Sequence, residues 1–163
     1  MSNRVIFLDI DGVLNSGRWY YERGGYVPRD ADMSAELDPS AIQCLNRIID
    51  QTGAKVCISS SWRILEDECE ANIAEMLAKR GFVGEVIGRT PIYRGKCPEM
   101  TRRGLEIQAW IEASSPFDSI CILDDSSDMA HLMPWLVQTT WAHGLTDEHV
   151  PCAVRMLTER SWP

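Results

Sequence analysis

The sequence predicts an α/β fold with a doubly wound parallel sheet, in one domain that spans residues 1–163. Short apolar runs rich in β-branched residues alternate with amphipathic segments, which is typical of strands and helices that take turns along the chain. Several of these runs are continuously apolar, as expected for strands that helices cover on both faces. The length fits one domain of ordinary size.

Five apolar runs are expected to form the strands of this sheet. They lie, in order, at residues 5–8, 55–58, 86–87 and 119–123, and at the run that starts at residues 136–137. The first and fourth runs end directly before the aspartates Asp9 and Asp124, and the second ends before Ser59. Polar residues therefore gather at three of the expected strand ends.

Amphipathic segments between these runs are expected to form helices. Asp38 and Pro39 suit the N-cap and the first turn of a helix that Gly53 ends. Apolar residues at helical spacing predict the other helices, which lie at residues 65–77, at residues 107–111 and after a cap at Thr146. A loop rich in Gly, Tyr and Pro is expected at residues 16–37.

Composition excludes several classes of protein. No apolar stretch reaches the roughly 18 residues of a membrane-spanning helix, and the N-terminus lacks the features of a signal peptide. We therefore expect a cytoplasmic protein that does not bind membranes. The six cysteines are widely spaced without a Cys-x-x-Cys pair, which favours free thiols over disulfides. The three histidines are also scattered, which disfavours a zinc site.

The net charge of −8 argues against nonspecific binding of nucleic acid, which needs cationic side chains that face phosphates. One local stretch differs from the rest of the chain. It holds the densest group of basic residues, Arg89, Arg94, Lys96, Arg102 and Arg103. This stretch is either a solvated loop and helix start or a local basic patch.

The expected strand ends carry groups suited to catalysis. These groups are Asp9 and Asp11 after the first strand, residues 59–61 after the second, and Asp124 with Asp125 after the fourth. In open parallel sheets, ligands bind beyond the carboxyl ends of the strands, where the strand order reverses. We therefore expect these groups to form one site.

Asp9 and Asp11 have the spacing that covalent phosphoryl transfer needs. A carboxylate can attack phosphorus and form an acyl phosphate, which is the role expected for Asp9. A second acid, Asp11, can protonate the leaving oxygen and then activate the water that hydrolyses the intermediate. Gly12 permits the tight backbone that turns both carboxylates into one pocket. The alternative is a loop that holds two acids without a catalytic role, for example as a calcium site.

A cation is expected among the acids, because Asp9, Asp124 and Asp125 would repel one another without it. Hard carboxylate oxygens and an incoming phosphate suit Mg²⁺, which would shield the nucleophile from the anionic substrate. The alternative for residues 124–128 is a helix N-cap turn. Asp128 is either such a cap or a group that supports the site.

A hydroxyl and a basic side chain complete the expected site. A serine at the end of the second strand can donate to a phosphate oxygen. Ser59, Ser60 and Ser61 are all candidates, because neighbours in a strand point to opposite faces. Arg103, Lys96 and Arg63 are the candidates for the cation that holds phosphate and nucleophile together.

Residues 5–15, with the sequence VIFLDIDGVLN, resemble the first motif of the haloacid dehalogenase (HAD) superfamily in its phosphatase form. The superfamily's phosphotransferases retain the second acid, here Asp11, and its dehalogenases lack it. Further segments resemble the second, third and fourth motifs, at residues 58–63, at residues 103–107 with Trp110, and at residues 122–125. The resemblance implies a Rossmann-like, HAD-like fold.

By this resemblance, Asp9 is the nucleophile and Asp11 is the general acid/base. Mg²⁺ would be bound by Asp9, Asp124 and the backbone carbonyl of Asp11, with Asp125 as the second acid of the fourth motif beside them.

The other two motif positions are less uniquely assigned. The motif hydroxyl falls on Ser60, with Ser59 as the second choice. The motif cation falls on Arg103, where Lys is commoner in the family, so Lys96 stays open.

Three patterns narrow the resemblance. They are SSWR at residues 60–63, RGxEIxxW at residues 103–110 and Gly-Leu-Thr at residues 144–146. Together they resemble small HAD-like domains associated with RNA repair proteins and with phage or bacterial proteins. The insertion points at residues 16–37 and 61–103 leave no room for a separate cap domain, so the resemblance implies a minimal cap and an open site.

An open site favours a large phosphorylated substrate, such as a nucleic-acid end or a phosphoprotein, over a buried small metabolite. A polynucleotide or nucleotide phosphate is therefore the expected substrate. Four aromatic residues of the first insertion are either a stacking platform for bases or a hydrophobic loop packed on the domain: Trp19, Tyr20, Tyr21 and Tyr26.

Two other functions are alternatives to a phosphatase. A receiver-type signalling domain also uses acids, a hydroxyl and a cation, on a flavodoxin-like sheet. Its phospho-acceptor lies on a later strand and a Lys stands near its last strand, whereas this chain has Asp-x-Asp first and no such Lys. A phosphate-binding module without turnover is the other alternative, but no core acid is missing here.

Overall fold

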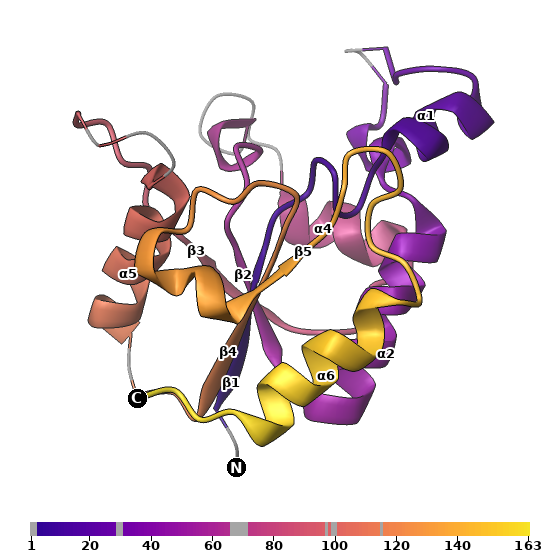
Figure 1. The fold of residues 1–163 in the computed structure, drawn as a ribbon. Coiled ribbons are helices and arrows are strands. Elements are labelled where there is room, and N and C mark those ends of the chain that lie inside the picture. The colour runs from indigo at the N-terminus through magenta and orange to yellow at the C-terminus, as the bar shows by residue number, and fades with distance from the viewer. Residues whose placement is uncertain (1–2, 29–30, 66–71, 97, 99–100, 115) are drawn as a thin grey trace.

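A computed structural model describes residues 3–28, 31–65, 72–96, 98, 101–114 and 116–163 of the chain. Its centre is a five-stranded parallel sheet in the order β3-β2-β1-β4-β5 (Figure 1). The strands are β1 (Arg4–Leu8), β2 (Lys55–Ile58), β3 (Val86–Arg89), β4 (Ser119–Asp124) and β5 (Leu136–Gln138). The predicted α/β fold with a doubly wound parallel sheet is confirmed, and each apolar run forms a strand.

Helices lie on both sides of the sheet. They are α1 (Gly17–Arg23), α2 (Pro39–Thr52), α4 (Ile73–Lys79), α5 (Arg102–Ser114) and α6 (His149–Glu159), with the 3-10 helices η1 (Met33–Glu36) and η2 (Ala130–Trp135). In Figure 1, α5 lies on one side of the sheet and α2 and α6 lie on the other. Within the described ranges, none of the helices is both long enough and apolar enough to cross a membrane.

Alternate residues of β1 face opposite layers of helices. Ile6 and Leu8 belong to a buried core that they share with α2, α4 and α6. Val5 and Phe7 belong to a second buried core that they share with α5 and η2. Because both faces of the strand are covered, its apolar run is continuous rather than alternating.

The strand order reverses between β1 and β4, which lie side by side at the middle of the sheet. Leu8 of β1 lies beside the last residue of β2 and beside Leu123 of β4. The next residues along each strand are Asp9, Ser59 and Asp124, so these three side chains stand at the same level. Open α/β sheets bind ligands at this kind of crevice.

Helix α2 begins and ends where the sequence predicts. The side chain of Asp38 is its N-cap and accepts a hydrogen bond from the backbone N–H of Ser40 at 2.8 Å. Gly53 ends the helix in the left-handed conformation, with φ of 65°, and donates its N–H to the carbonyl of Ile49 at 2.7 Å.

The expected loop at residues 16–37 contains two short helices, α1 and η1. The side chain of Ser16 caps α1 by accepting a hydrogen bond from the backbone N–H of Trp19 at 3.2 Å. The loop prediction is therefore wrong for these helical residues.

The helix expected at residues 107–111 is present as α5, whereas the helices expected at residues 65–77 and after Thr146 begin later than predicted. Cys69 and the other residues at 66–71 of the helix expected at residues 65–77 lie outside the described residues. The prediction of one helix from residue 65 is wrong, because Asn72 is extended and its side chain caps α4, which begins at Ile73. Thr146 does not cap α6, which begins three residues later at His149. Instead, the hydroxyl of Thr146 lies 2.9 Å from Nδ1 of His149, so it stabilises the turn before the helix.

Candidate active site

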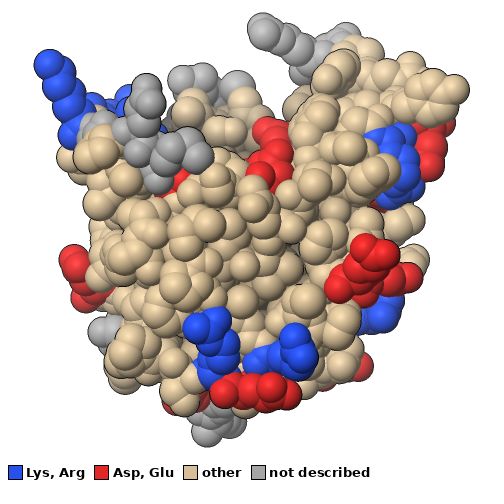
Figure 2. All heavy atoms as spheres, viewed as in Figure 1, with Lys and Arg blue, Asp and Glu red and all other residues tan. Residues whose placement is uncertain are grey.

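The carboxyl ends of β1, β2 and β4 bring the expected acids and serines together. The backbone N–H of Asp9 donates to the carbonyl of Leu123 at 2.9 Å, and the N–H of Ser59 donates to the carbonyl of Leu8 at 2.8 Å. Asp9 is 5% exposed and Asp124 is fully buried. Figure 2 shows acidic side chains inside a hollow at the top of the molecule, the side toward which these strands run in Figure 1.

Three of the acids form a cluster that can hold a metal ion. Asp9, Asp124 and Asp125 each offer one carboxylate oxygen, and these oxygens lie within 4.8 Å of one another. Oδ1 of Asp124 accepts a hydrogen bond from the backbone N–H of Ser126 at 2.9 Å. Oδ2 of Asp124 is buried and receives no hydrogen bond of normal geometry from the described residues. A buried oxygen without a donor, with two further acids beside it, fits a divalent cation that prefers hard ligands, such as Mg²⁺.

Burial and mutual repulsion raise the pKa values of these acids. Burial raises the pKa of Asp124 to about 8, and the charge of Asp9 adds to the rise. Burial also raises the pKa of Asp9, although the charge of Arg103 and a hydrogen bond from Ser60 oppose it. The pKa of Asp125 is raised as well, chiefly by burial. Without a metal ion, the cluster therefore resists carrying three negative charges.

Arg103 is brought to the acids from α5. Its Nη2 lies 3.7 Å from Oδ2 of Asp9, and its Nε lies 3.2 Å from Oδ2 of Asp124. The second contact is an ion pair whose angle does not make a hydrogen bond. Of the other two candidate cations, Arg63 is buried in an ion pair with Glu106 and Lys96 is exposed, and neither forms an ion pair with the clustered acids among the described residues.

Asp11 is held by donors from two segments of the chain. Nε1 of Trp62 lies 3.1 Å from each of its carboxylate oxygens, and Nδ2 of Asn15 donates to Oδ1 at 2.7 Å. Oδ1 of Asn15 in turn accepts the backbone N–H of Gly12 at 3.0 Å. These contacts fix the direction of the carboxylate. Trp62 and Asn15 are not among the site residues predicted from the sequence, although both stand inside the motif-like segments.

The structure distinguishes the serines that follow β2. The hydroxyl of Ser60 donates to the carboxylate of Asp9, and its Oγ accepts the backbone N–H of Trp62 at 3.3 Å. Ser59 is buried, and its hydroxyl has no hydrogen-bond partner in the part of the chain that is described. Ser60, the first choice from the sequence, thus lies against the expected nucleophile.

The loop after β1 passes close over Asp125 at Gly12. Gly12 has a φ of +73°, and a Cβ there would lie 2.2 Å from Oδ2 of Asp125, so only glycine fits. Thr139, which follows β5, fixes the same loop, because its hydroxyl donates to the carbonyl of Gly12 at 2.6 Å. Its N–H donates to the carbonyl of Asp124 at 3.0 Å. Thr139 is another site residue that the sequence does not reveal.

Asp128 holds the start of α5 next to the acids. Its Oδ2 accepts the backbone N–H of Arg103 at 3.2 Å, and its Oδ1 accepts the hydroxyl of Ser126 at 3.0 Å. The carbonyl of Asp128 accepts the backbone N–H of Gly104 at 3.0 Å. Asp128 does not cap the helix that follows it, η2, whose N-cap is Met129. Its contacts with α5 correspond to the other alternative, a group that supports the site, because they position Arg103.

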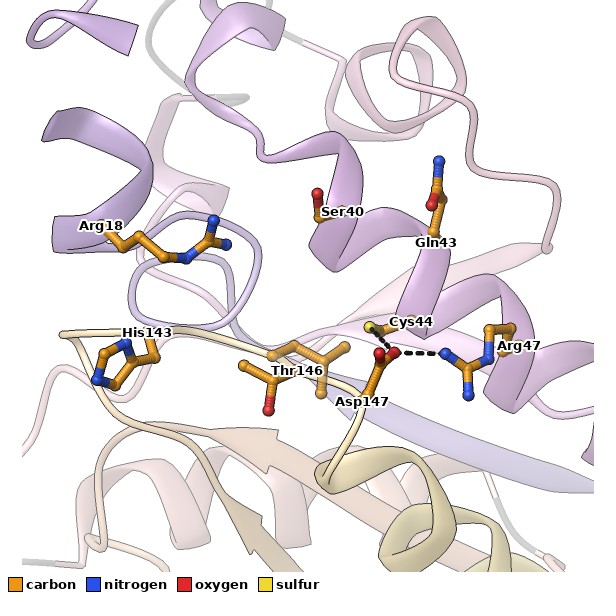
Figure 3. Close-up of a pocket in the computed structure, with 9 residues that line it drawn as sticks. Arg18, Ser40, Gln43, Cys44, Arg47, His143, Thr146 and Asp147 are labelled. Carbon is orange, nitrogen blue, oxygen red and sulfur yellow. Dashed lines mark hydrogen bonds and ion pairs between the residues drawn. The ribbon is translucent and has the colours of Figure 1, made fainter. Parts of the chain in front are cut away.

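A hollow of about 480 Å³ lies elsewhere on the surface, between α2 and the segment before α6 (Figure 3). Its charged residues are paired. Asp147 contacts Arg47 and accepts a hydrogen bond from the thiol of Cys44. Arg18 forms an ion pair with Asp38 at 2.6 Å. Because these charges satisfy one another, the acids at the strand ends remain the candidate active site.

Comparison with protein families matches residues 5–150, from β1 to the start of α6, to the HAD domain in Swiss Army Knife RNA repair proteins. The match covers well over half of the chain and contains all of the acids and serines described above. A search among curated proteins finds no match. The motif resemblance is thereby confirmed, and the chain belongs to the family of HAD domains found in Swiss Army Knife RNA repair proteins.

Proposed function

We propose that the protein is a Mg²⁺-dependent phosphomonoester hydrolase that works through an aspartyl-phosphate intermediate. Family membership supports an enzyme of the phosphatase kind. The observation that carries the proposal is the convergence of Asp9, Asp124 and Asp125 within 4.8 Å of one another. Arg103 forms ion pairs with two of these acids, which adds the cation that an anionic substrate needs.

In the proposed first step, a carboxylate oxygen of Asp9 forms a bond to phosphorus. The ester oxygen departs with the bonding electron pair and takes a proton from the Asp11 carboxyl group, so that a neutral alcohol leaves. In the second step, Asp11 removes a proton from water and the water oxygen bonds to phosphorus. The bond between phosphorus and Asp9 then breaks, which releases inorganic phosphate.

The remaining residues have supporting roles in this proposal. Ser60 can donate its hydroxyl to a phosphate oxygen, and Arg103 can hold the phosphate beside the nucleophile. Asp9, Asp124 and Asp125, with the backbone carbonyl of Asp11, would hold Mg²⁺. Bound there, the ion reduces the repulsion between the carboxylate nucleophile and the anionic phosphate.

The substrate that we propose is the terminal phosphate of a polynucleotide or of a nucleotide. The family description refers to RNA repair, which favours phosphorylated nucleic acid. Among the described residues, the connection between β1 and α2 holds only the short helices α1 and η1. An open site of this kind admits the end of a large molecule.

Phosphate release from an aryl phosphate, with Mg²⁺ and with EDTA, tests the proposal. We expect Mg²⁺-dependent release by the wild type and its loss in Asp9→Asn, with an unchanged circular dichroism spectrum. Asp50→Asn is the matched control, because Asp50 is exposed on α2, away from the strand ends. Turnover by Asp9→Asn at the wild-type rate would contradict the covalent mechanism.

The receiver-type alternative receives less support from the fold. Receiver domains have a flavodoxin-like sheet with the strand order 2-1-3-4-5. The order here is β3-β2-β1-β4-β5, and the acid pair follows the first strand of the chain. We therefore favour the hydrolase.

A further inference from the structure

Two adjoining hollows lead away from the candidate active site along the segment before α5. The first, of about 200 Å³, is lined in part by Arg63, Arg102 and Arg103. The second, of about 240 Å³, is lined in part by Arg63, Arg89 and Arg94. Both hollows include Arg63 and Ile92 in their walls, so they adjoin each other, and we call the pair the arginine groove.

The floor of the arginine groove is fixed by hydrogen bonds and is electrically neutral. Arg63 and Glu106 are both buried and form an ion pair at 2.9 Å. Nη1 of Arg63 donates to the carbonyl of Thr90 at 2.8 Å, and Oε1 of Glu106 accepts the backbone N–H of Tyr93 at 2.9 Å. The buried pair thereby anchors the segment that precedes Arg94.

The rim of the groove carries an excess of positive charge. Arg94 and Arg102 are exposed, and neither forms an ion pair with the residues that the structure describes. Arg102 donates one N–H to the carbonyl of Tyr93 at 3.0 Å, which leaves its other N–H groups for a ligand. The two carboxylates that line the groove are engaged, Glu106 by its buried ion pair and Asp128 by its contacts at the start of α5.

This local charge contrasts with the rest of the chain, whose net charge is −8. In Figure 2, Lys and Arg side chains protrude at the upper left, to one side of the acidic hollow. A polyanion could approach the acidic centre along that side with less repulsion than elsewhere.

We infer that the arginine groove binds the backbone phosphates adjacent to the terminal phosphate of a polynucleotide substrate. The inference rests on the proposed phosphatase function and adds a second contact for its substrate. The groove opens at Arg103, whose Nη2 lies 3.7 Å from Asp9, so the hydrolysed phosphate and the next phosphates share one path. Guanidinium groups bind phosphate through paired N–H donors. A phosphoprotein or a small metabolite lacks the repeated anions that this row of arginines matches.

The test compares wild type with Arg94→Gln/Arg102→Gln on a short RNA with a terminal phosphate and on p-nitrophenyl phosphate. We expect the ratio of kcat/KM for RNA to kcat/KM for the aryl phosphate to fall about tenfold or more. The slope of log(kcat/KM) for RNA against log[salt] should become shallower by about one for each arginine removed. Arg155→Gln, an exposed arginine on α6, is the matched control and should leave the ratio unchanged.

An unchanged ratio in the double variant would overturn the inference, because it would mean that the groove does not discriminate between the substrates. Binding of the same RNA to Asp9→Asn protein, followed by fluorescence anisotropy, separates the groove from the chemistry. Weaker binding after the two substitutions in this background would support the groove even if the wild type released no phosphate. Equal binding would overturn the groove even in an active phosphatase.

Discussion

The carboxylate of Asp11 receives N–H groups from both Trp62 and Asn15, and these contacts bear directly on its proposed role. A general acid must keep an oxygen within hydrogen-bond reach of the leaving oxygen. Without partners, an aspartate in a loop would divide its time among several rotamers. The indole and the amide reduce this freedom before the substrate arrives, which lowers the entropic part of the barrier. We therefore expect Trp62 to be a positioning residue.

Trp62→Phe removes the indole N–H and keeps an aromatic ring in the core. We expect kcat/KM for an alkyl phosphate to fall about tenfold, a fraction of the ~10²–10⁴-fold loss expected for Asp11→Asn. The fall should be smaller for p-nitrophenyl phosphate, because its leaving group needs little help from a proton. Steady-state kinetics on both substrates measures this difference.

Trp19→Phe is the matched control for this prediction. The indole N–H of Trp19 is buried and has no hydrogen-bond partner among the described residues, so its removal breaks no such contact. Rate constants close to those of the wild type are expected for this variant. Equal losses on the two substrates in Trp62→Phe would indicate a packing defect and contradict the positioning role.

At the residue scale, the sequence predicts acids better than it predicts the groups that hold them. Asp9 and Asp124 directly follow apolar runs, so their place at one edge of a parallel sheet could be predicted. The contact of Trp62 with Asp11 spans 51 residues, and that of Thr139 with Gly12 spans 127. Such contacts depend on how loops far apart in the sequence pack against each other, and a local sequence pattern does not predict this packing.

Among the elements, α5 determines where Arg103 lies. Gly104 in its first turn packs against the segment after β4, and a Cβ at this position would lie 2.2 Å from the carbonyl oxygen of Met129. Asp128 binds the backbone of Arg103 at the same place. The helix approaches the acids this closely only because residue 104 has no side chain.

Gly104→Ala is therefore expected to push α5 away from the segment after β4 and to withdraw Arg103. We expect a loss of about 1–3 kcal/mol in the free energy of unfolding, as for overpacking in cores. This loss should exceed the gain of about 1 kcal/mol that Ala brings to a helix interior. Urea denaturation measures the change in stability, and the aryl phosphate assay should show a lower rate.

Gly17→Ala in α1 is the control, because a Cβ there would lie 3.5 Å from its nearest neighbour, an ordinary contact. Its stability should equal or exceed that of the wild type. If Gly104→Ala proved as stable as Gly17→Ala, the close packing of α5 would not be the constraint that the geometry indicates.

The strands and the long amphipathic helix α2 could be predicted, and the short helix α1 could not. The strands and α2 have clear runs and caps, whereas α1 has only seven residues. Helices this short depend on tertiary packing, and α1 has it, since the ring of Tyr20 lies 5.8 Å from that of Trp141. The turn before α6 shows the same limit, because the hydroxyl of Thr146 contacts the ring of His149 and does not cap the helix.

Over the whole molecule, the sequence predicts which segments form strands, but it does not predict which strands lie side by side in the sheet. Chain order alone leaves several arrangements of five parallel strands, and the right-handed crossover rule removes only some of them. The observed order puts β1 between β2 and β4, so the site gathers residues from segments more than 100 positions apart. This gathering concentrates buried negative charge, which links the stability of the fold to pH and to the metal.

In the metal-free protein, burial raises the pKa of Asp124 from 3.8 to about 8. Between these values, the native state keeps a proton that the unfolded state has released. The contribution of Asp124 to the free energy of unfolding therefore decreases as pH rises through this range. A bound cation would reverse the effect, because it replaces the proton and favours the ionised carboxylate.

Thermal denaturation in EDTA and in Mg²⁺, at several pH values, tests this linkage with wild type, Asp124→Asn and the control Asp50→Asn. In EDTA, we expect the Tm of the wild type to decline with rising pH relative to that of Asp124→Asn, which cannot ionise at this position. Mg²⁺ should raise the Tm of the wild type, and the rise should be larger at higher pH. A ligand at a hundred times its Kd adds about 2.7 kcal/mol to the free energy of unfolding. Asp124→Asn should respond little to Mg²⁺, and Asp50→Asn should follow the wild type.

Parallel curves of Tm against pH for wild type and Asp124→Asn in EDTA would contradict this linkage. They would mean that Asp124 is ionised in the metal-free protein, so that the buried acid cluster is stable without its cation.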